Sequence, residues 1–292
     1  MQKQKPGVLL MITLLLLASG CTLKPSPADA PLRAGLRSSH YGISPFPNTD
    51  WWVDSTGSMA ARFDGSVPSV VWIVGVVGGS SCLLNFPISS PDEGSPNIIS
   101  TSYLDKNEEY LTRFDQAGVQ VWLQVEPASA DVSTLVDLVL KRYSSHPSVV
   151  GFGVDVEWYE NEDYHEGKAV TDAEARAWSE QVRSYNPGYQ LFLKHWLSEK
   201  MPPTYREGMM FLDDSQIFES LDGMVGEFKT WGETFAPASV GFQYGYRSDK
   251  KWWGDFSDPP KEIGQALVNE VPNLADLYWV DFTAEEIWPQ DQ

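Results

Sequence analysis

Two acidic side chains, Asp155 and Glu157, end a run of strand-forming residues in the segment SVVGFGVDVEWYENEDY. Side chains alternate between the two faces of a β-strand, so the two acids are predicted to share one face with Gly151 and Gly153. Two carboxyl groups in this arrangement lie about 6.6 Å apart along the strand, and each raises the proton affinity of the other. A carboxyl group that keeps its proton near neutral pH can act as a general acid, so the pair predicts acid–base catalysis.

The elements that must position these acids can be predicted from the pattern of apolar residues. Segments of helical character separate most of the strand-like runs, and one of them, TDAEARAWSEQVRSY, opens with a capping box of Thr171 and Glu174. Alternating strands and helices predict a parallel sheet, and eight units favour a closed (β/α)8 TIM barrel in a single α/β domain. An open doubly wound sheet is the alternative, but no glycine-rich fingerprint follows the early strands. The eight predicted strands cover residues 40–46, 69–77, 119–127, 149–158, 189–196, 208–216, 239–246 and 277–283.

Polar side chains are concentrated at the carboxyl ends of these predicted strands, where the active site of such a barrel lies. The third strand, QVWLQVE, places Trp122 and Glu126 on one face and its aliphatic residues on the other. The polar residues at the strand ends are Glu126, Asp155, Glu157, Lys194, His195, Asp213, Asp214, Gln216, Gln243, Tyr244, Tyr246 and Asp281.

Aromatic residues indicate the class of ligand. The chain contains 12 tryptophans, and several follow predicted strands. Their flat rings form apolar platforms for the C–H faces of sugar rings, so we expect a carbohydrate ligand, with space for a sugar ring above Gly151 and Gly153. The catalytic candidates are Glu157, Asp155, Asp213 and Asp214, and the substrate-binding candidates are Glu126, Trp122, Lys194, His195, Trp196, Gln216, Gln243, Tyr244, Tyr246, Asp281, Trp51 and Trp52.

The Asp-x-Glu motif and the aromatics that follow it, DVEWY, resemble the catalytic segment of family 18 glycoside hydrolases, the chitinase group. The motif is also similar to the Asp-x-Glu of family 25 lysozymes. The resemblance implies that Glu157 is the general acid and that Asp155 orients the acetamido group of the substrate or tunes the proton. It also implies that Tyr244 or Tyr246 is the assisting tyrosine. Glycines replace the upstream aspartates of the longer chitinase motif, and YGISPF lacks the first-strand aspartate of family 25.

The first residues, MQKQKPGVLLMITLLLLASGC, have the features of a signal peptide, namely two lysines, an apolar run and small residues before Cys21. The cleavage region resembles the bacterial lipoprotein lipobox, which implies that Cys21 is lipidated and anchors an exported protein at the cell membrane or cell envelope. An ordinary secretory signal is the alternative. We therefore expect a signal peptide over residues 1–20, the lipidated cysteine and a flexible tether over 21–39, and the barrel domain over 40–292.

Charge and histidine content restrict the partners. A net charge of −19 repels nucleic acid and anionic lipid headgroups, so we expect no nucleic-acid partner and a membrane contact only through the lipid. The four histidines show no metal-ligand spacing, and neither a metal nor a cofactor is expected. A metal-dependent hydrolase remains an alternative whose ligands would be Glu126, Glu157, His195 and Asp213.

Two other functions compete. The first is a glycoside hydrolase that acts on an extracellular or cell-envelope polysaccharide, with Glu157 as acid and Asp155, Asp213 or Asp214 as the second carboxylate. The other is a non-catalytic glycan-binding lipoprotein on a barrel scaffold. A salt bridge between Glu157 and Lys194 would favour the binding protein, because a carboxylate paired with lysine cannot donate a proton to the substrate.

Overall fold

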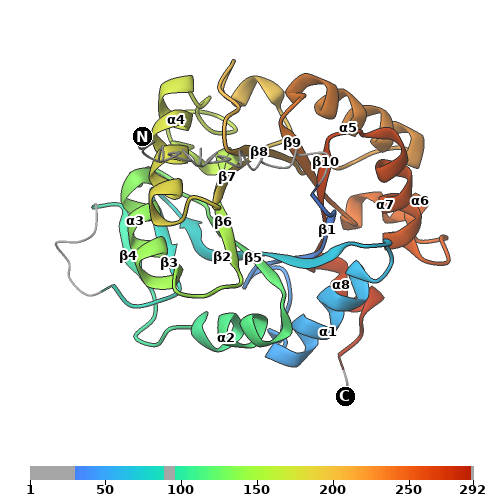
Figure 1. The fold of residues 1–292 in the computed structure, drawn as a ribbon, viewed down its shortest axis with the longest axis horizontal. Helices are drawn as coiled ribbons and strands as arrows, with labels where there is room; N and C mark the ends of the chain where they lie inside the picture. The colour runs from blue at the N-terminus through green and yellow to red at the C-terminus, as the bar shows by residue number, and fades with distance from the viewer. Residues whose placement is uncertain (1–29, 89–95, 291–292) are drawn as a thin grey trace, which may run out of the picture.

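The computed structural model describes residues 30–88 and 96–290. In this part of the chain, eight parallel strands form a closed ring that is surrounded by helices (Figure 1). The ring closes because β1 pairs in parallel with both β10 and β2. The predicted single-domain TIM barrel is therefore confirmed. The barrel strands are β1 (Arg33–Ser38), β2 (Val67–Gly78), β5 (Gln120–Val125), β6 (Val149–Asp155), β7 (Gln190–Lys194), β8 (Met209–Asp213), β9 (Ser239–Tyr244) and β10 (Leu274–Val280).

The outer layer departs from a regular barrel in two places. Two short strands, β3 (Ser81–Leu84) and β4 (Ile98–Ser100), extend the sheet from β2. The connection from β7 to β8 contains only a 3₁₀ turn, η4 (Ser198–Lys200), instead of an α-helix. The helices are α1 (Thr49–Ala60), α2 (Glu108–Ala117), α3 (Val132–Tyr143), α4 (Asp172–Tyr185), α5 (Leu221–Phe235), α6 (Lys250–Trp253), α7 (Pro259–Glu270) and α8 (Ala284–Ile287).

The first strand lies earlier than the sequence predicts. The prediction over residues 40–46 is wrong, because β1 occupies Arg33–Ser38, inside the segment expected to be a flexible tether. The alternation of RAGLRS explains the error. Ala34 and Leu36 belong to the core beneath the helices, while Arg33 and Arg37 face the barrel axis and hide the apolar character of the strand.

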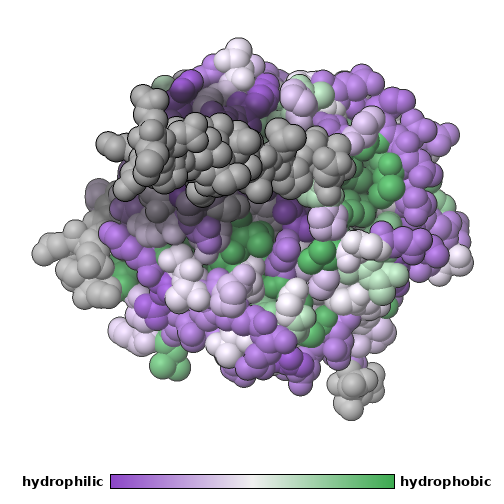
Figure 2. Space-filling model, viewed as in Figure 1, coloured by the Kyte–Doolittle hydropathy of each residue, from purple (hydrophilic) through white to green (hydrophobic). Residues whose placement is uncertain are grey.

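The signal peptide and Cys21 lie outside the described residues, so lipidation remains a prediction. Among the residues that the structure describes, no helix combines the length and the apolar composition needed to cross a membrane. The face of the molecule drawn in Figure 2 is largely hydrophilic, in keeping with the acidic composition.

Aromatic rings fill the inside of the barrel. A Cβ atom on Gly151 would lie 2.3 Å from the ring of Trp122, and one on Gly153 would lie 2.0 Å from the ring of Phe192. The prediction that these glycines leave space for a sugar ring is therefore wrong, since the rings of neighbouring strands occupy that space. Trp122 is fully buried and donates its indole N–H to Asp276 Oδ1 at 3.1 Å, so it is an interior residue and does not reach a ligand. The interior cluster consists of Val71, Trp122, Phe192, Met210, Leu212 and Tyr278.

Candidate active site

A buried lysine joins the carboxyl ends of three neighbouring strands. Lys194, the last residue of β7, places its Nζ atom 2.9 Å from Asp155 Oδ2 and 2.5 Å from Asp214 Oδ2. Asp155 ends β6, and Asp214 directly follows β8. All three side chains are at most 7% exposed. The inward-facing residues at the ends of β6, β7 and β8 thus form one ionic cluster at the mouth of the barrel.

The cluster contains more acid than base. Burial works against the charge of Lys194, but Asp155 and Asp214 outweigh it and hold the pKa of the ammonium group well above its usual value. Burial raises the pKa of Asp155 against the attraction of Lys194, and the nearby Glu157, Asp214 and Glu126 raise it further. The cluster therefore retains a proton at a pH where an isolated, exposed carboxyl group has lost it.

Glu157 reaches the mouth from a turn, because β6 ends at Asp155 and Val156–Trp158 form the 3₁₀ turn η3. The predicted strand spacing between the two acids is therefore wrong. Glu157 is partly buried and lines a pocket of about 580 Å³. It makes no hydrogen bond or ion pair with the rest of the described chain. Burial, opposed by Lys194 and assisted by Asp214 and Glu126, raises its pKa. Glu157 thus presents a carboxyl group with increased proton affinity to the pocket.

Other side chains complete this pocket. Trp196 and Gln216 were predicted to bind substrate, and both line it. Glu227, on the exposed face of α5, also lines it and accepts a hydrogen bond from Ser215 Oγ. The sequence analysis missed Glu227, because a glutamate within an amphipathic helix carries no signal that distinguishes it from any solvated glutamate. The lining residues of the described chain are Glu157, Trp196, Asp214, Ser215, Gln216, Ile217 and Glu227.

The opposite side of the mouth is held together by Arg37. Its Nη1 atom donates to Asp281 Oδ1 at 2.7 Å, and its Nη2 atom donates to the hydroxyl oxygen of Tyr41 at 2.7 Å. Tyr41 in turn donates to Glu126 Oε1 at 2.5 Å. Asp281 and Glu126 lie at the mouth, as predicted. Arg37 and Tyr41 were missed because the first strand was predicted in the wrong place.

Two further predicted residues lie between these groups. Tyr246 donates its hydroxyl hydrogen to Gln243 Oε1 at 3.3 Å, and both side chains are buried. Burial raises the pKa of Tyr246 well above its usual value, with Asp214 contributing in the same direction. The ring of Tyr246 therefore packs at the mouth as a neutral phenol.

Three predicted residues point away from the mouth, because strand alternation turns them toward the helices. Asp213 lies on the opposite face of the chain from Asp214, is fully buried and accepts a hydrogen bond from the Ser215 amide at 2.8 Å. Tyr244 belongs to the core beneath the helices and donates to the carbonyl oxygen of Pro260 at 3.0 Å. These placements correct the catalytic prediction for Asp213 and the binding prediction for Tyr244.

His195 is the third of these residues. Its Nε2 atom lies 2.8 Å from the carbonyl oxygen of Glu166, and its Nδ1 atom accepts a hydrogen bond from the Leu197 amide at 2.8 Å. Burial lowers its pKa. A neutral ring with both nitrogens engaged is a structural residue, so its predicted binding role is corrected, and it cannot join the proposed metal ligand set. Within the described residues, no three His, Cys, Asp or Glu side chains are arranged to hold a metal ion.

The connection that contains His195 is joined to the loop that contains Glu157. Lys200, in the connection from β7 to β8, donates from Nζ to the carbonyl oxygens of His165 at 3.0 Å and Gly167 at 2.7 Å. The Val170 amide donates to the Lys200 carbonyl oxygen at 2.9 Å. These bonds replace the support that an α-helix gives in the other connections.

The paired tryptophans after the first predicted strand are not at the mouth. Residues 49–60 form α1, so Trp52 is fully buried in the core beneath the helices. Trp51 donates its indole N–H to the carbonyl oxygen of Trp288 at 3.0 Å on the outside of the barrel. Both predicted sugar contacts are therefore corrected. Helical spacing and contact with α8 determine the positions of these rings.

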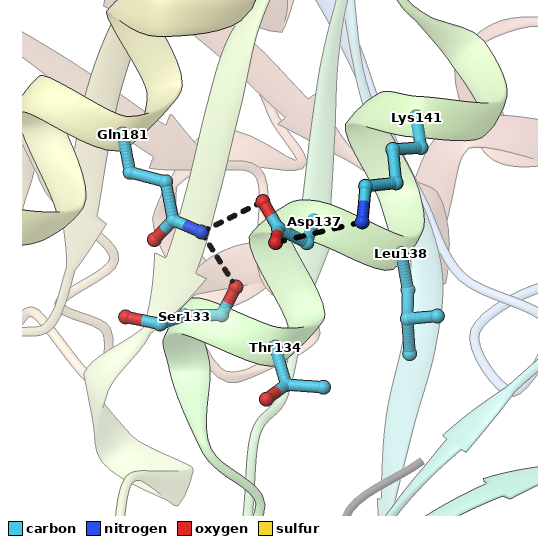
Figure 3. A pocket seen from close by; sticks show the side chains of 6 residues that line it. All are labelled: Ser133, Thr134, Asp137, Leu138, Lys141 and Gln181. Carbon is cyan, nitrogen blue, oxygen red and sulfur yellow. Dashed lines mark hydrogen bonds and ion pairs between the residues drawn. The ribbon is translucent and has the colours of Figure 1, made fainter. Parts of the chain in front are cut away.

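A second pocket lies between α3 and α4 (Figure 3) and contains none of the mouth residues. Gln181 of α4 points across to α3 and donates from Nε2 to Asp137 Oδ1 at 2.8 Å and to the Ser133 carbonyl oxygen at 2.9 Å. Lys141 lies 3.7 Å from Asp137. The polar groups of this pocket satisfy one another, so it is an interhelical packing feature.

Comparison with known proteins supports the fold. A scan with protein-family models and a search of curated proteins found no match. A solved structure of a putative alpha-L-fucosidase from Bacteroides thetaiotaomicron is similar over 94% of this chain and 92% of that chain, with a TM-score of 0.54 and 12% identity. A beta-1,4-D-mannanase from Cryptopygus antarcticus is similar over 89% of this chain and 91% of that chain, with a TM-score of 0.52 and 12% identity.

A Bacteroides uniformis beta-glucuronidase has a TM-score of 0.50 and 13% identity, and the match covers 86% of this chain and 30% of that larger chain. All three of these neighbours are named for activity on glycosides or polysaccharides. At identities this low the likeness concerns the fold alone, and the closer resemblance to families 18 and 25 remains a prediction. The chain has the TIM-barrel fold that these glycoside hydrolases share.

Proposed function

We propose that the protein is a glycoside hydrolase that acts on an extracellular or cell-envelope polysaccharide, with Glu157 as general acid. The observation that carries this proposal is the pocket at the mouth, where Glu157 and Asp214 lie in one lining with Trp196. Glycosidases use two carboxyl groups beside the glycosidic bond, one of them protonated. A partly exposed indole ring offers the flat apolar surface on which a sugar ring packs.

The two acids have different surroundings, as this chemistry requires. The raised pKa of Glu157 favours the protonated form, which can donate to the leaving oxygen. Asp214 lies 2.5 Å from the Lys194 ammonium group and is suited to act as the carboxylate that stabilises positive charge on the sugar or activates water. Asp155, behind Lys194, positions the lysine. Asp214 thus takes the role of the second carboxylate.

The arrangement of Lys194 favours a hydrolase over a non-catalytic glycan-binding protein. The binding protein was expected to tie Glu157 to Lys194. Instead, Lys194 pairs with Asp155 and Asp214, and in the described structure Glu157 is open to the pocket. A protein that only binds glycans has no need of a carboxyl group, such as that of Glu157, that faces the pocket without a partner in the described chain.

Exposed apolar side chains around the same end of the barrel support a polymeric substrate. Three exposed large apolar residues of the described chain lie in loops that follow barrel strands, and such side chains can contact sugars beyond the cleaved bond. Tyr41 follows β1, Tyr164 follows β6 and Ile217 follows β8.

The test is a screen of glycans with the wild-type protein, followed by comparison of Glu157→Gln on a glycan that is cleaved. The variant keeps the shape of the side chain but cannot donate a carboxyl proton, so the rate should fall about 100-fold or more while binding survives. Glu162→Gln, on an exposed residue of the same loop, is the matched control and should cleave at the wild-type rate. If Glu157→Gln is as fast as wild type, the hydrolase proposal fails.

A further inference from the structure

The pocket next to Glu157 is lined by acids without a basic residue of its own. Among its described lining residues are Glu157, Asp214 and Glu227, and none is a lysine, arginine or histidine. The nearest ammonium group is that of Lys194, which already pairs with Asp155 and Asp214. The carboxyl groups of the three pocket acids and of Asp155 therefore have the single ammonium group of Lys194 among them. The side of this cluster that faces the pocket is negative.

Buried hydrogen-bond acceptors at the same place lack donors. Within the described residues, Asp214 Oδ1, Asp155 Oδ1 and Gln124 Oε1 have no hydrogen-bond partner. The Asp214 side chain is 7% exposed and that of Asp155 1%. Asp214 also lines the pocket, so a carboxylate with one oxygen that has no donor within the described chain forms part of the pocket wall. A ligand that brings donors would supply bonds that the folded chain leaves unmade.

We propose that this pocket binds a hexosamine unit with a free, protonated amino group, within a polysaccharide whose amino sugars lack acetyl groups. An ammonium group offers a positive charge and three donors and has no acceptor, which matches a negative pocket with unpaired acceptors. Trp196 adds a ring face that attracts both a sugar and a cation. A neutral sugar supplies donors without the charge, and a uronic acid or a sulfated sugar is repelled. The inference rests on the proposed function in that the same pocket holds the sugar beside the cleaved bond.

Binding can be measured apart from catalysis with the full-length Glu157→Gln protein. Isothermal titration with chitosan and polygalactosamine oligomers, each compared with its N-acetylated form and with an oligogalacturonate, should give the order free amine, then acetylated, then acidic. A chelator in every titration prevents a bound metal ion from supplying the contrast. The preference for the amine should weaken with added salt, because it is electrostatic. Equal affinity for free and acetylated forms, or no binding of either amine oligomer, overturns the proposal.

A pair of variants on α5 locates the effect in the pocket. Glu227→Gln removes one pocket charge from an exposed position, and Glu233→Gln makes the same change on the same helix outside the pocket lining. Glu227→Gln should reduce the ratio of amine to acetylated affinity about 3- to 10-fold, and Glu233→Gln should leave it unchanged. Equal effects of the two variants would show that the preference comes from the overall charge of the protein, against the proposal.

The two proposals can fail separately. Wild-type cleavage of a neutral glycan without any amine preference would sink the inference and leave the hydrolase proposal standing. An amine preference that depends on Glu227, in a protein that cleaves no amine-bearing glycan, would support the binding site and sink the hydrolase proposal.

Discussion

Two glycines on β6 determine what occupies the middle of the barrel. Gly151 lies against Trp122, and Gly153 lies against Phe192, so aromatic rings from β5 and β7 meet where side chains of β6 would otherwise stand. The interior is closed by this contact, and a ligand can lie only above it, among the polar groups of the mouth. The absence of a side chain at these two positions thus defines the floor of the site.

Gly153→Ala should destabilise the protein by about 2 kcal/mol, because a methyl group 2.0 Å from the Phe192 ring forces packed residues apart. Denaturant unfolding measures the change. Gly226→Ala on α5, where an added Cβ meets nothing within 4 Å, is the control and should gain about 0.5–1 kcal/mol from helix propensity. Unchanged stability of Gly153→Ala would show that the rings give way without cost.

Strand alternation predicted side-chain direction well where the strand continued and poorly where it ended. On β5, Trp122 and Gln124 lie on the inner face and the aliphatic residues lie on the other face, in agreement with the predicted separation. At the end of β8, the pattern did not show which of Asp213 and Asp214 faces the mouth, and at the end of β6 the backbone leaves the strand before Glu157. Polar residues occur both at the end of a strand and at the start of the next turn, so the sequence does not show at which residue the strand ends.

At the scale of elements, the start of α4 supports the loop that carries Glu157. The Glu174 carboxylate accepts hydrogen bonds from the amide and hydroxyl of Thr171, from Lys168 Nζ at 2.9 Å and from the Tyr159 hydroxyl at 2.9 Å. Tyr159 follows η3 directly. The predicted capping box is confirmed, and it also joins the helix to the turn of the proposed acid.

Glu174→Gln should lower the unfolding free energy at neutral pH by about 1 kcal/mol, because the amide can still cap the helix but loses the charge that strengthens its hydrogen bonds and pairs with Lys168. Burial opposes the charge, but hydrogen bonds from Lys168, Thr171 and Tyr159 lower the Glu174 pKa from 4.5 to about 2. A carboxyl group whose pKa falls on folding stabilises the protein above its unfolded pKa, and this contribution is lost as the pH decreases through the folded pKa.

The difference between wild type and Glu174→Gln should therefore be constant above pH 4.5 and decrease toward pH 2. Urea unfolding across this range measures it, with Glu180→Gln on the exposed side of α4 as the control. A difference that grows on acidification would contradict the assignment.

The misplaced first strand shows why some elements cannot be predicted from local sequence. Arg33 and Arg37 look like residues of a solvated tether, and their buried partners Asp276 and Asp281 lie more than 240 residues later in the chain. Only the closed ring brings them together. The other barrel strands can be predicted from the sequence because each contains a run of apolar residues long enough to identify it as a strand.

At the scale of the whole molecule, β1 closes the barrel through ionic contacts inside it. Arg33 donates to both carboxylate oxygens of Asp276 on β10, at 2.8 and 2.7 Å, and Asp276 is fully buried. Arg37 makes the corresponding contact to Asp281 at the mouth. The contacts between β1 and the end of β10 therefore both close the barrel and form part of the site at its mouth.

Arg33→Met should cost about 3–5 kcal/mol, because it leaves the Asp276 charge buried without a cation. The double variant Arg33→Met/Asp276→Asn should recover part of the loss, since the amide keeps an acceptor for Trp122 and Tyr278. Guanidinium unfolding provides the measurement. Arg113→Met, which breaks the exposed pair with Asp50, should change stability by less than about 0.5 kcal/mol. A loss for Arg33→Met no larger than that control would contradict the account of closure.

The link between the connection from β7 to β8 and the loop after β6 has a mechanical consequence for the pocket. Lys200 and His195 bind that loop, so the wall with Trp196 and the wall with Glu157 form one stiff side. The opposite wall contains Ile217, which has a φ of 71° and is 70% exposed. Hydrogen bonds from Ser215 to Glu227 and from the Phe218 amide to Asp249 hold this wall as well, so a sugar meets a preformed pocket in which the acid has a constant position.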